Sequence, residues 1–268
     1  IILEGPGGIG KSRLLEEGYR QRQRYINLLN GRLRITQVIN LDDINLQIPM
    51  NLGRRLARDV AAAYFQPYFD KTDDSLLLES KGLLSPEALE RHLHENDNVF
   101  LRCYEAVADK ERVVLLLDTA EAILLLPLGR YLAKLISKLD NTLTLIATRD
   151  GDKAYDLLNQ AIREGSQQLS LERIPLPGFG AQTAQDYFSQ TPLSGYLVSL
   201  PNVRENLVLL TNGVPLLLAL AAEWLRRDIV LPELGKPSDE LRRLPPDEMS
   251  QVQIGFEKSL ATSVCSLD

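Results

Sequence analysis

The sequence contains little cysteine, tryptophan or histidine, and it has no long apolar run. Its two cysteines, Cys103 and Cys265, lie far apart and have no metal-ligand neighbours, which excludes a disulfide framework and predicts reduced thiols. The longest apolar stretch, residues 214–222, is much shorter than the roughly 20 residues that span a bilayer. The sequence also shows no signal peptide. We therefore expect a cytoplasmic protein with no membrane partner.

The charge balance gives no sign of a nucleic-acid-binding surface over the whole chain. The sequence has 30 Lys and Arg against 36 Asp and Glu, and hence a net charge of −6. A local basic surface stays open, because one stretch gathers arginines around Tyr19 and Tyr25, namely Arg13, Arg20, Arg22, Arg24, Arg32 and Arg34. We interpret this stretch as a solvated helix face, so the sequence disfavours nucleic acid as a partner.

A glycine-rich segment near the start of the chain has the pattern of a phosphate-binding loop. The apolar stretch 1–4 is typical of a short strand, and it is followed by Gly5, Pro6, Gly7, Gly8, Ile9, Gly10, Lys11 and Ser12. Glycines let successive backbone N–H groups curl around a phosphate without a Cβ in the way. Lys11 then supplies positive charge to the β and γ phosphates, Ser12 supplies a hydroxyl to Mg²⁺, and the helix that begins near Lys11 and Arg13 points its positive end at the same anion. The segment predicts that the chain binds a nucleoside triphosphate.

Strands and helices alternate along the first two thirds of the chain. Strands are predicted at 34–41, 112–118, 142–148 and 169–174, and helices at 11–30, 51–65, 99–109, 129–139 and 153–164. Residues 66–97 read as a polar, irregular stretch with one helix, capped by Ser85 and starting at Pro86. This alternation predicts an α/β fold, a three-layer parallel-sheet P-loop NTPase domain over residues 1–176.

The remaining third of the chain is helical in pattern. Helices are predicted at 181–190, 202–211 and 214–227, which defines a small all-α lid domain over residues 177–247. A further helix over residues 249–260 is interpreted as the start of a truncated, winged-helix-like domain at 248–268. The chain starts without a methionine, and we take it as a piece of something longer.

Two acids are candidates for the chemistry next to the phosphate loop. The apolar run 112–117 ends in Asp118, where a P-loop enzyme places the carboxylate that holds Mg²⁺. Thr119 follows Asp118, at the position where fast ATPases carry a glutamate that orients water, so we expect slow hydrolysis. The nearest acid is Glu121, which is either a water-positioning residue or an ordinary acid at a helix start.

An arginine follows the next predicted strand. Residues 142–148 are succeeded by Arg149 and Asp150, at the strand end that faces the γ-phosphate in such sheets. The guanidinium fork matches phosphate oxygens, and the third phosphate adds the charge with which it pairs. Arg149 is therefore a candidate sensor that distinguishes ATP from ADP, with an ordinary surface arginine as the alternative.

Four features in this order resemble the signal transduction ATPases with numerous domains (STAND), the class that includes the NB-ARC proteins. They are the loop 5–12, the run that ends in Asp118, the residues 147–150, and the segment 211–220, in which Gly213, Val214 and Pro215 open an apolar helix. By itself the last feature is also an ordinary connection between two helices, in which glycine ends one and proline starts the next.

The resemblance implies a function and a set of roles. It implies bound ATP or ADP with Mg²⁺, with Lys11 and Ser12 on the phosphates and Mg²⁺, Asp118 on Mg²⁺, Arg149 as γ-phosphate sensor, and Pro215 at the base of the nucleotide. It also implies effector and sensor domains flanking this chain, and a switch that hydrolyses ATP slowly and forms homo-oligomers in the ATP state. Two alternatives stay open: an AAA+-type motor or loader that acts on DNA or protein, and an interaction scaffold with a vestigial site.

Overall fold

The computed structural model describes residues 1–81, 85–165, 169–190, 202–226 and 237–264. Its contacts divide the chain into two compact units. The first unit contains Ile1–Gly5 and Lys11–Pro175, and the second contains Pro6–Gly10 and Leu176–Asp268. The predicted boundaries at 176 and 247 stay a prediction, because this division places part of the phosphate loop with the second unit. Cys265 lies outside the described residues.

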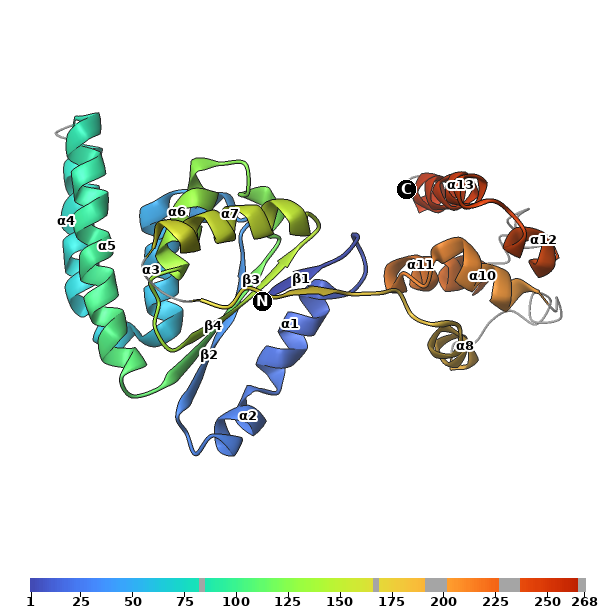
Figure 1. The fold of residues 1–268 in the computed structure, drawn as a ribbon, viewed down its shortest axis with the longest axis horizontal. Helices are drawn as coiled ribbons and strands as arrows, with labels where there is room; N and C mark the ends of the chain where they lie inside the picture. Colours follow the sequence, from blue (N-terminus) through green and yellow to red (C-terminus); the bar gives the residue numbers. More distant parts are fainter. Residues whose placement is uncertain (82–84, 166–168, 191–201, 227–236, 265–268) are drawn as a thin grey trace. The chain divides into compact units, whose positions relative to one another are not determined.

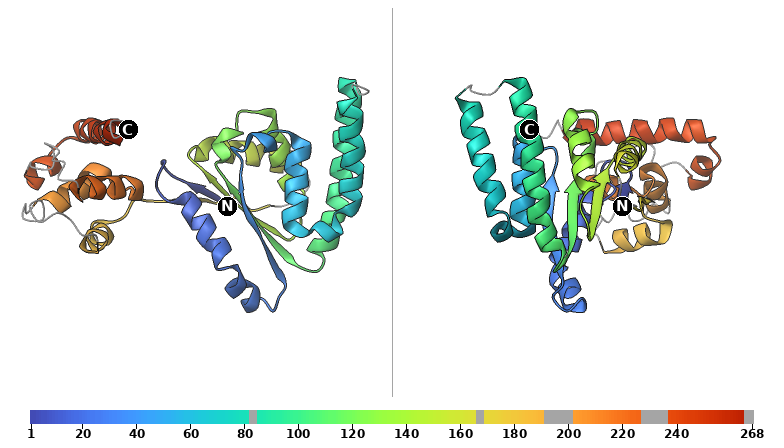
Figure 2. Two further views of the ribbon diagram at one scale, coloured as in Figure 1. Left: turned by 180° about the vertical axis from the view of Figure 1, so that it is seen from behind. Right: turned by 60° about the vertical axis from the view of Figure 1, so that its left-hand side comes forward.

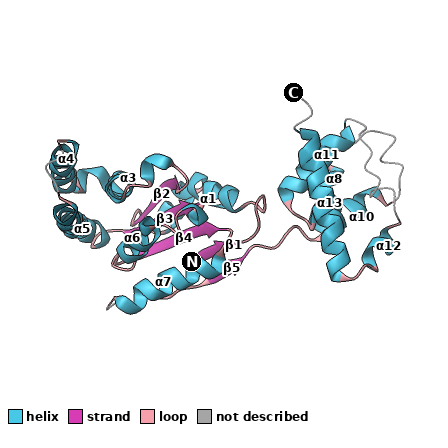
Figure 3. Cartoon of the chain, turned by 90° about the horizontal axis from the view of Figure 1, so that it is seen from above, coloured by secondary structure: helices cyan, strands magenta, loops and turns pink. Residues whose placement is uncertain are grey.

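The first unit is built on a parallel sheet, in which the strands lie in the order β2-β3-β4-β1-β5 (Figure 3). The strands are β1 (Ile2–Glu4), β2 (Leu33–Asn40), β3 (Arg112–Asp118), β4 (Thr142–Thr148) and β5 (Arg173–Pro175). The apolar run of β3 forms an inner strand between β2 and β4, in which Val113 and residues 115–118 are buried and Val114 is partly buried. The register pairs Leu3 of β1 with Ala147 of β4, so the ends of these two strands lie side by side.

Helices cover the two faces of the sheet unequally (Figure 1). The helices of this unit are α1 (Lys11–Arg20), α2 (Arg22–Leu28), α3 (Pro49–Ala61), α4 (Gln66–Ser80), α5 (Pro86–Ala108), α6 (Pro127–Ile136) and α7 (Gly151–Glu164). One face of the sheet carries the large core, in which Val113, Leu115 and Leu117 of β3 pack against α3, α5, α6 and α7. The other face carries α1 and a much smaller cluster around Leu3, Leu15 and Leu116. Helices on both faces of a parallel sheet confirm the predicted three-layer α/β fold.

The helical hairpin of α4 and α5 corrects our interpretation of residues 66–97 as irregular. The two helices lie side by side, and α5 is continuous through residues 86–108 instead of starting again at 99. Ser85 caps α5, as predicted, by accepting a hydrogen bond from the backbone N–H of Ala88 at 3.3 Å. Helix α4 has little apolar periodicity, because its buried side toward α5 includes polar groups. The sequence pattern therefore did not indicate a helix there.

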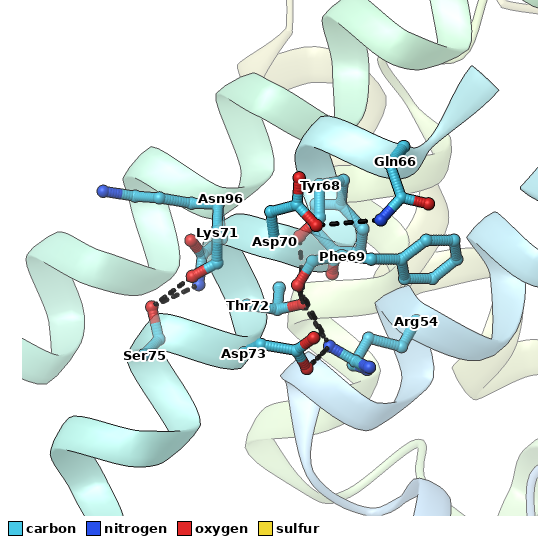
Figure 4. Close-up of polar contacts among 10 residues, drawn as sticks. All are labelled: Arg54, Gln66, Tyr68, Phe69, Asp70, Lys71, Thr72, Asp73, Ser75 and Asn96. Atoms are coloured by element: carbon cyan, nitrogen blue, oxygen red, sulfur yellow. Dashed lines mark hydrogen bonds and ion pairs between the residues drawn. The ribbon is translucent and has the colours of Figure 1, made fainter. Parts of the chain in front are cut away.

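Figure 4 shows these polar contacts. The Arg54 guanidinium donates to the hydroxyl of Thr72 and to the carboxylate of Asp73, each at 2.6 Å. The Asn96 amide donates to the hydroxyl of Ser75 at 3.3 Å, and the Ser75 hydroxyl donates to a backbone carbonyl of α4 at 3.1 Å. Thr72, Ser75 and Asn96 are all buried; the bond between Asn96 and Ser75 joins α5 to α4, whereas the bond between Arg54 and Thr72 joins α3 to α4.

The predicted helix over residues 11–30 is wrong in one respect, because it is divided at Gln21 into α1 and α2. Helix α1 buries Lys11 and Leu15, whereas α2 buries no residue at all. Packing against the sheet therefore does not hold α2 in line with α1. The last strand is also shorter than predicted and covers Arg173–Pro175 alone.

The second unit is helical in its described parts. It contains α8 (Ala181–Ser189), α10 (Val203–Thr211), α11 (Pro215–Arg226), α12 (Ser238–Arg242) and α13 (Pro246–Val264). Asn212 and Gly213 adopt positive φ angles of 49° and 67° between α10 and α11, which confirms the predicted end of one helix and start of the next at Pro215. Phe256 and Leu260 of α13 share one core with Leu207, Leu210 and Leu218. The separate domain expected from residue 248 stays a prediction.

Candidate functional site

Three neighbouring strands bring the predicted site residues to one edge of the sheet. Strands β3, β4 and β1 are adjacent and parallel, so their carboxyl ends meet at the same edge. Asp118 ends β3, Arg149 follows β4, and β1 leads through Gly5 into the loop before Lys11. This edge is where open parallel sheets bind their ligands.

The loop between β1 and α1 depends on glycine at two positions in particular. Gly8 and Gly10 have φ angles of 76° and 102°, which side chains with a Cβ rarely adopt. The carbonyl of Gly8 accepts a hydrogen bond from the backbone N–H of Leu216 at 3.3 Å, and a Cβ added at Gly8 would lie 2.7 Å from the Cβ of Leu216. This contact lies within the second unit, to which Pro6–Gly10 belong.

Lys11 starts α1 and is buried, with 8% of its surface exposed. Its Nζ donates to the carbonyl of Gly5 at 2.6 Å, which holds the ammonium group back toward the loop. The pKa of Lys11 lies below its ordinary value, mainly because the side chain is buried. The charge of Glu121 raises this pKa, that of Arg149 lowers it, and that of Asp118 raises it. These opposing effects show that the three charged side chains act electrostatically on the same ammonium. Ser12 and Arg13 follow on the exposed side of the first turn, and Arg13 pairs with Glu16 at 3.4 Å.

Asp118 is buried at the end of β3, with 9% of its surface exposed. Its Oδ1 accepts a hydrogen bond from the backbone N–H of Thr119 at 2.9 Å. Thr119 adopts the left-handed conformation, with φ at 57° and ψ at 42°, which is strained for a β-branched residue. The strand therefore turns sharply after Asp118, and the next residues form the short helix η3 (Ala120–Ala122), which carries Glu121.

Glu121 and Arg149 form an ion pair across the site. The Arg149 Nε donates to Glu121 Oε1 at 3.1 Å, and the backbone N–H of Arg149 donates to Glu121 Oε2 at the same distance. The Arg149 side chain is 67% exposed and the Glu121 side chain 26% exposed, so the guanidinium lies at the open side of the pair. This pair was missed from the sequence, because Glu121 and Arg149 lie 28 positions apart and carry no shared pattern.

The donor set at this edge fits Mg²⁺ held largely by substrate oxygens and water. Asp118 offers a carboxylate whose second oxygen has no hydrogen bond within the described residues, and Ser12 offers an exposed hydroxyl. The described residues contain no group of three or more His, Cys, Asp and Glu side chains that would enclose a metal ion. A site of one carboxylate and one hydroxyl is typical of Mg²⁺ bound together with phosphates.

The structure thus brings four of the predicted residues together in the first unit, and a fifth, Pro215, belongs to the second unit. Lys11, Asp118, Glu121 and Arg149 share one edge of the first unit. Pro215 is the first residue of α11 in the second unit, directly before Leu216, the residue that contacts Gly8. Leu216 was not predicted as a site residue, because nothing in an apolar helix sequence marks one leucine as the partner of a distant glycine.

No family model matches the sequence, and none of the curated proteins matches it. A search of solved structures finds similarity to the structure of the Aeropyrum pernix ORC1 protein in complex with DNA, with 13% sequence identity and a TM-score of 0.49. The match covers 96% of this chain and 59% of that one. The strand order, the parallel pairing and the loop before α1 define the P-loop NTPase fold without this likeness.

We expected nucleic acid to be disfavoured as a partner, and this exclusion is wrong. The ORC1 protein named above was solved in complex with DNA. The net charge of the chain does not describe its local surfaces, and Arg22, Arg24 and Arg32 are exposed on and after α2.

The structure also bears on the membrane question in one respect: within the described residues, no helix combines the length and apolar character that a bilayer crossing requires.

Proposed function

We propose that this chain binds ATP at the carboxyl edge of the sheet and hydrolyses it slowly to ADP and phosphate. The observation that carries the proposal is the convergence of Lys11, Asp118, Glu121 and Arg149 beside a glycine-rich loop. Mg²⁺ held by Ser12 and Asp118 would neutralise charge on the phosphates when bound. Glycines 5, 7, 8 and 10, with Pro6 and Ile9, would supply the backbone that wraps the phosphates, with Arg13 beside them and Pro215 at the base of the nucleotide.

The ion pair between Glu121 and Arg149 suggests how hydrolysis is coupled to the third phosphate. In the structure the Arg149 side chain and its backbone N–H both donate to the Glu121 carboxylate, so the two side chains are paired with each other. A γ-phosphate offers the guanidinium a second anion of higher charge. Arg149 would then move toward the phosphate, and Glu121 would be released to accept a hydrogen bond from the attacking water. Lys11 would leave the Gly5 carbonyl for the phosphates in the same event.

Arg149→Ala tests this proposal directly. We expect its affinity for ATP to fall about tenfold while its affinity for ADP stays unchanged, because only ATP carries the group that Arg149 contacts. Isothermal titration calorimetry with both nucleotides measures the two affinities. Arg163→Ala, which removes an exposed arginine of α7, is the matched control and should change neither affinity. Equal weakening of ATP and ADP by Arg149→Ala would contradict the sensor role.

Two uses of such an ATPase are proposed, and an observation favours each. A STAND-type switch, which self-associates in the ATP state, is favoured by Thr119 in place of a glutamate directly after Asp118. An AAA+-type motor or loader that acts on DNA or protein is favoured by Glu121, because this acid lies at the site and can orient water once Arg149 releases it. The AAA+-type motor or loader is at least as well supported as the STAND-type switch.

Turnover and assembly separate these two uses. A motor predicts steady ATP hydrolysis that rises severalfold when DNA or a protein substrate is added. A switch predicts little turnover under all conditions, together with a larger mass in ATP than in ADP by light scattering. Glu121→Gln should abolish turnover in both cases and leave ATP binding intact, since the amide cannot accept the water's proton.

A further inference from the structure

The face of the sheet that carries α1 and α2 is incompletely covered. Residues of β3 that point to the opposite face are buried, whereas Val114 of β3, Ile35 of β2 and Leu145 of β4 are only partly buried on this face. Leu143 of β4 is 43% exposed. Parallel sheets normally have both faces covered, so this face lacks part of its cover within the described residues.

A groove of about 1050 Å³ lies between this face and the two helices. Its lining is mainly apolar and includes Leu14, Leu28, Leu29, Val114, Leu143 and Leu145. Figure 2 shows α1 and α2 on one side of the sheet, opposite α3, α6 and α7. The helix side of the groove exposes large apolar side chains: Leu14 is 48% exposed, Leu28 70% and Leu29 41%. An apolar surface this exposed and continuous marks an interaction site.

The charges around the groove are mostly positive. Arg112 lines the groove, and Arg24 and Arg32, which directly precede the lining residues Tyr25 and Leu33 in the sequence, are exposed. These three arginines form no ion pair within the described residues, and they contrast with Arg34, which pairs with Glu111 at 2.9 Å. Asp140 is the acid that lines the groove. The groove lining itself thus carries one positive and one negative charge, and Arg24 and Arg32, in the segments that line it, add two exposed positive charges.

We propose that this groove binds an amphipathic α-helix of a partner protein that carries acidic residues beside its apolar stripe. A helix with its side chains is roughly 10 Å across, and its apolar stripe would replace the missing cover of the sheet. Carboxylates beside that stripe would meet Arg24, Arg32 and Arg112. The same arginines disfavour a second copy of this chain as the occupant, since two basic rims repel. The concave shape disfavours a bilayer surface, which is flat on this scale.

The test uses two synthetic helical peptides of about 18 residues with leucines at i, i+3, i+4 and i+7. One carries glutamates beside the leucines and the other carries lysines at the same positions. In fluorescence anisotropy we expect the acidic peptide to bind at least about tenfold more tightly than the basic one, and the difference to shrink in high salt. Equal affinities, or no binding by the acidic peptide, would overturn the proposal.

Variants locate the binding. Leu28→Asp should weaken the acidic peptide about tenfold, and Arg112→Glu should reduce or reverse the preference for it. The matched controls are Leu125→Asp and Arg130→Glu, which alter an exposed leucine and an exposed arginine that do not line the groove. Equal loss in Leu28→Asp and Leu125→Asp would overturn the assignment. Two further results would overturn it, because each points to a different occupant. One is a dimer, seen by light scattering, that Leu28→Asp dissociates. The other is flotation of the protein with vesicles of anionic lipid that Leu28→Asp abolishes.

Discussion

Thr119 shows how a single residue can store strain at the site. Within the described residues, four residues other than glycine have positive φ angles, and the other three are asparagines: Asn30, Asn141 and Asn212. Asparagine tolerates this conformation, whereas a β-branched residue does not. Thr119 keeps it because its N–H binds Asp118 and because η3 follows at once. The strained turn at Thr119 fixes the direction in which the chain leaves β3, between Asp118 and Glu121.

Thr119→Asn should therefore stabilise the chain. The substitution relieves strain of about 1 kcal/mol, which corresponds to a rise in melting temperature of roughly 2–4 °C for a chain of this size. Thermal unfolding followed by circular dichroism measures this shift. Thr142→Asn is not expected to stabilise, because Thr142 lies in an ordinary strand conformation in β4. A lower melting temperature for Thr119→Asn would show that the threonine side chain contributes more than its strain costs.

Asp97 on α5 makes stability depend on pH. Burial raises the pKa of Asp97 above its ordinary value of 3.8, while the hydrogen bond that Tyr131 donates to it and the charge of Lys138 lower it. The folded state thus holds a proton that the unfolded state has already released. The stability from this group is complete below about pH 3.8 and is lost as the pH rises through the higher, folded-state pKa.

Asp97→Asn should remove this part of the pH dependence. The amide oxygen can still accept the hydrogen bond from Tyr131, which lies 2.9 Å from Asp97 Oδ1, but the side chain no longer ionises. We expect the variant to gain stability relative to the wild type as the pH rises from 3.5 toward neutrality. Urea unfolding at a series of pH values measures this difference. A difference that stays constant over the series would contradict the account.

At the scale of elements, the sequence predicted the parts whose signals are local. Strands β3 and β4 were found from continuous apolar or β-branched runs, and α10 and α11 were found from apolar periodicity and the glycine and proline between them. The hairpin of α4 and α5 was missed, because Thr72, Ser75 and Asn96 are buried through hydrogen bonds to partners up to 21 positions away. A polar residue in the sequence does not show whether it will find such a partner.

The connection between α10 and α11 can be tested at Gly213. A Cβ added there would lie 2.2 Å from the carbonyl oxygen of Phe179, and the φ of 67° is itself unfavourable for alanine. We expect Gly213→Ala to destabilise the helical unit by roughly 2 kcal/mol or more. Denaturant unfolding measures the loss. Gly255→Ala, in an open position on α13, should instead stabilise by about 0.5–1 kcal/mol.

At the scale of the whole molecule, the site shows how far sequence reasoning reached. The loop, Asp118 and Arg149 were predicted because each lies at or directly after the end of a recognisable strand, and the parallel order of β3, β4 and β1 brings these ends to one edge. The ion pair between Glu121 and Arg149 could not be predicted, since it depends on the turn at Thr119. Net charge gave a misleading exclusion of nucleic acid, because a sum over the chain contains no information about position.

The most direct test of the account is a calorimetric titration of ATP with Mg²⁺ into the wild type and into Lys11→Ala. Lys134→Ala is the control, because the Lys134 side chain forms an exposed ion pair with Glu164 at 3.4 Å, between α6 and α7. We expect saturable binding by the wild type and the control, and a loss of affinity of at least about a hundredfold in Lys11→Ala. Unchanged ATP binding by Lys11→Ala would contradict the assignment of this site.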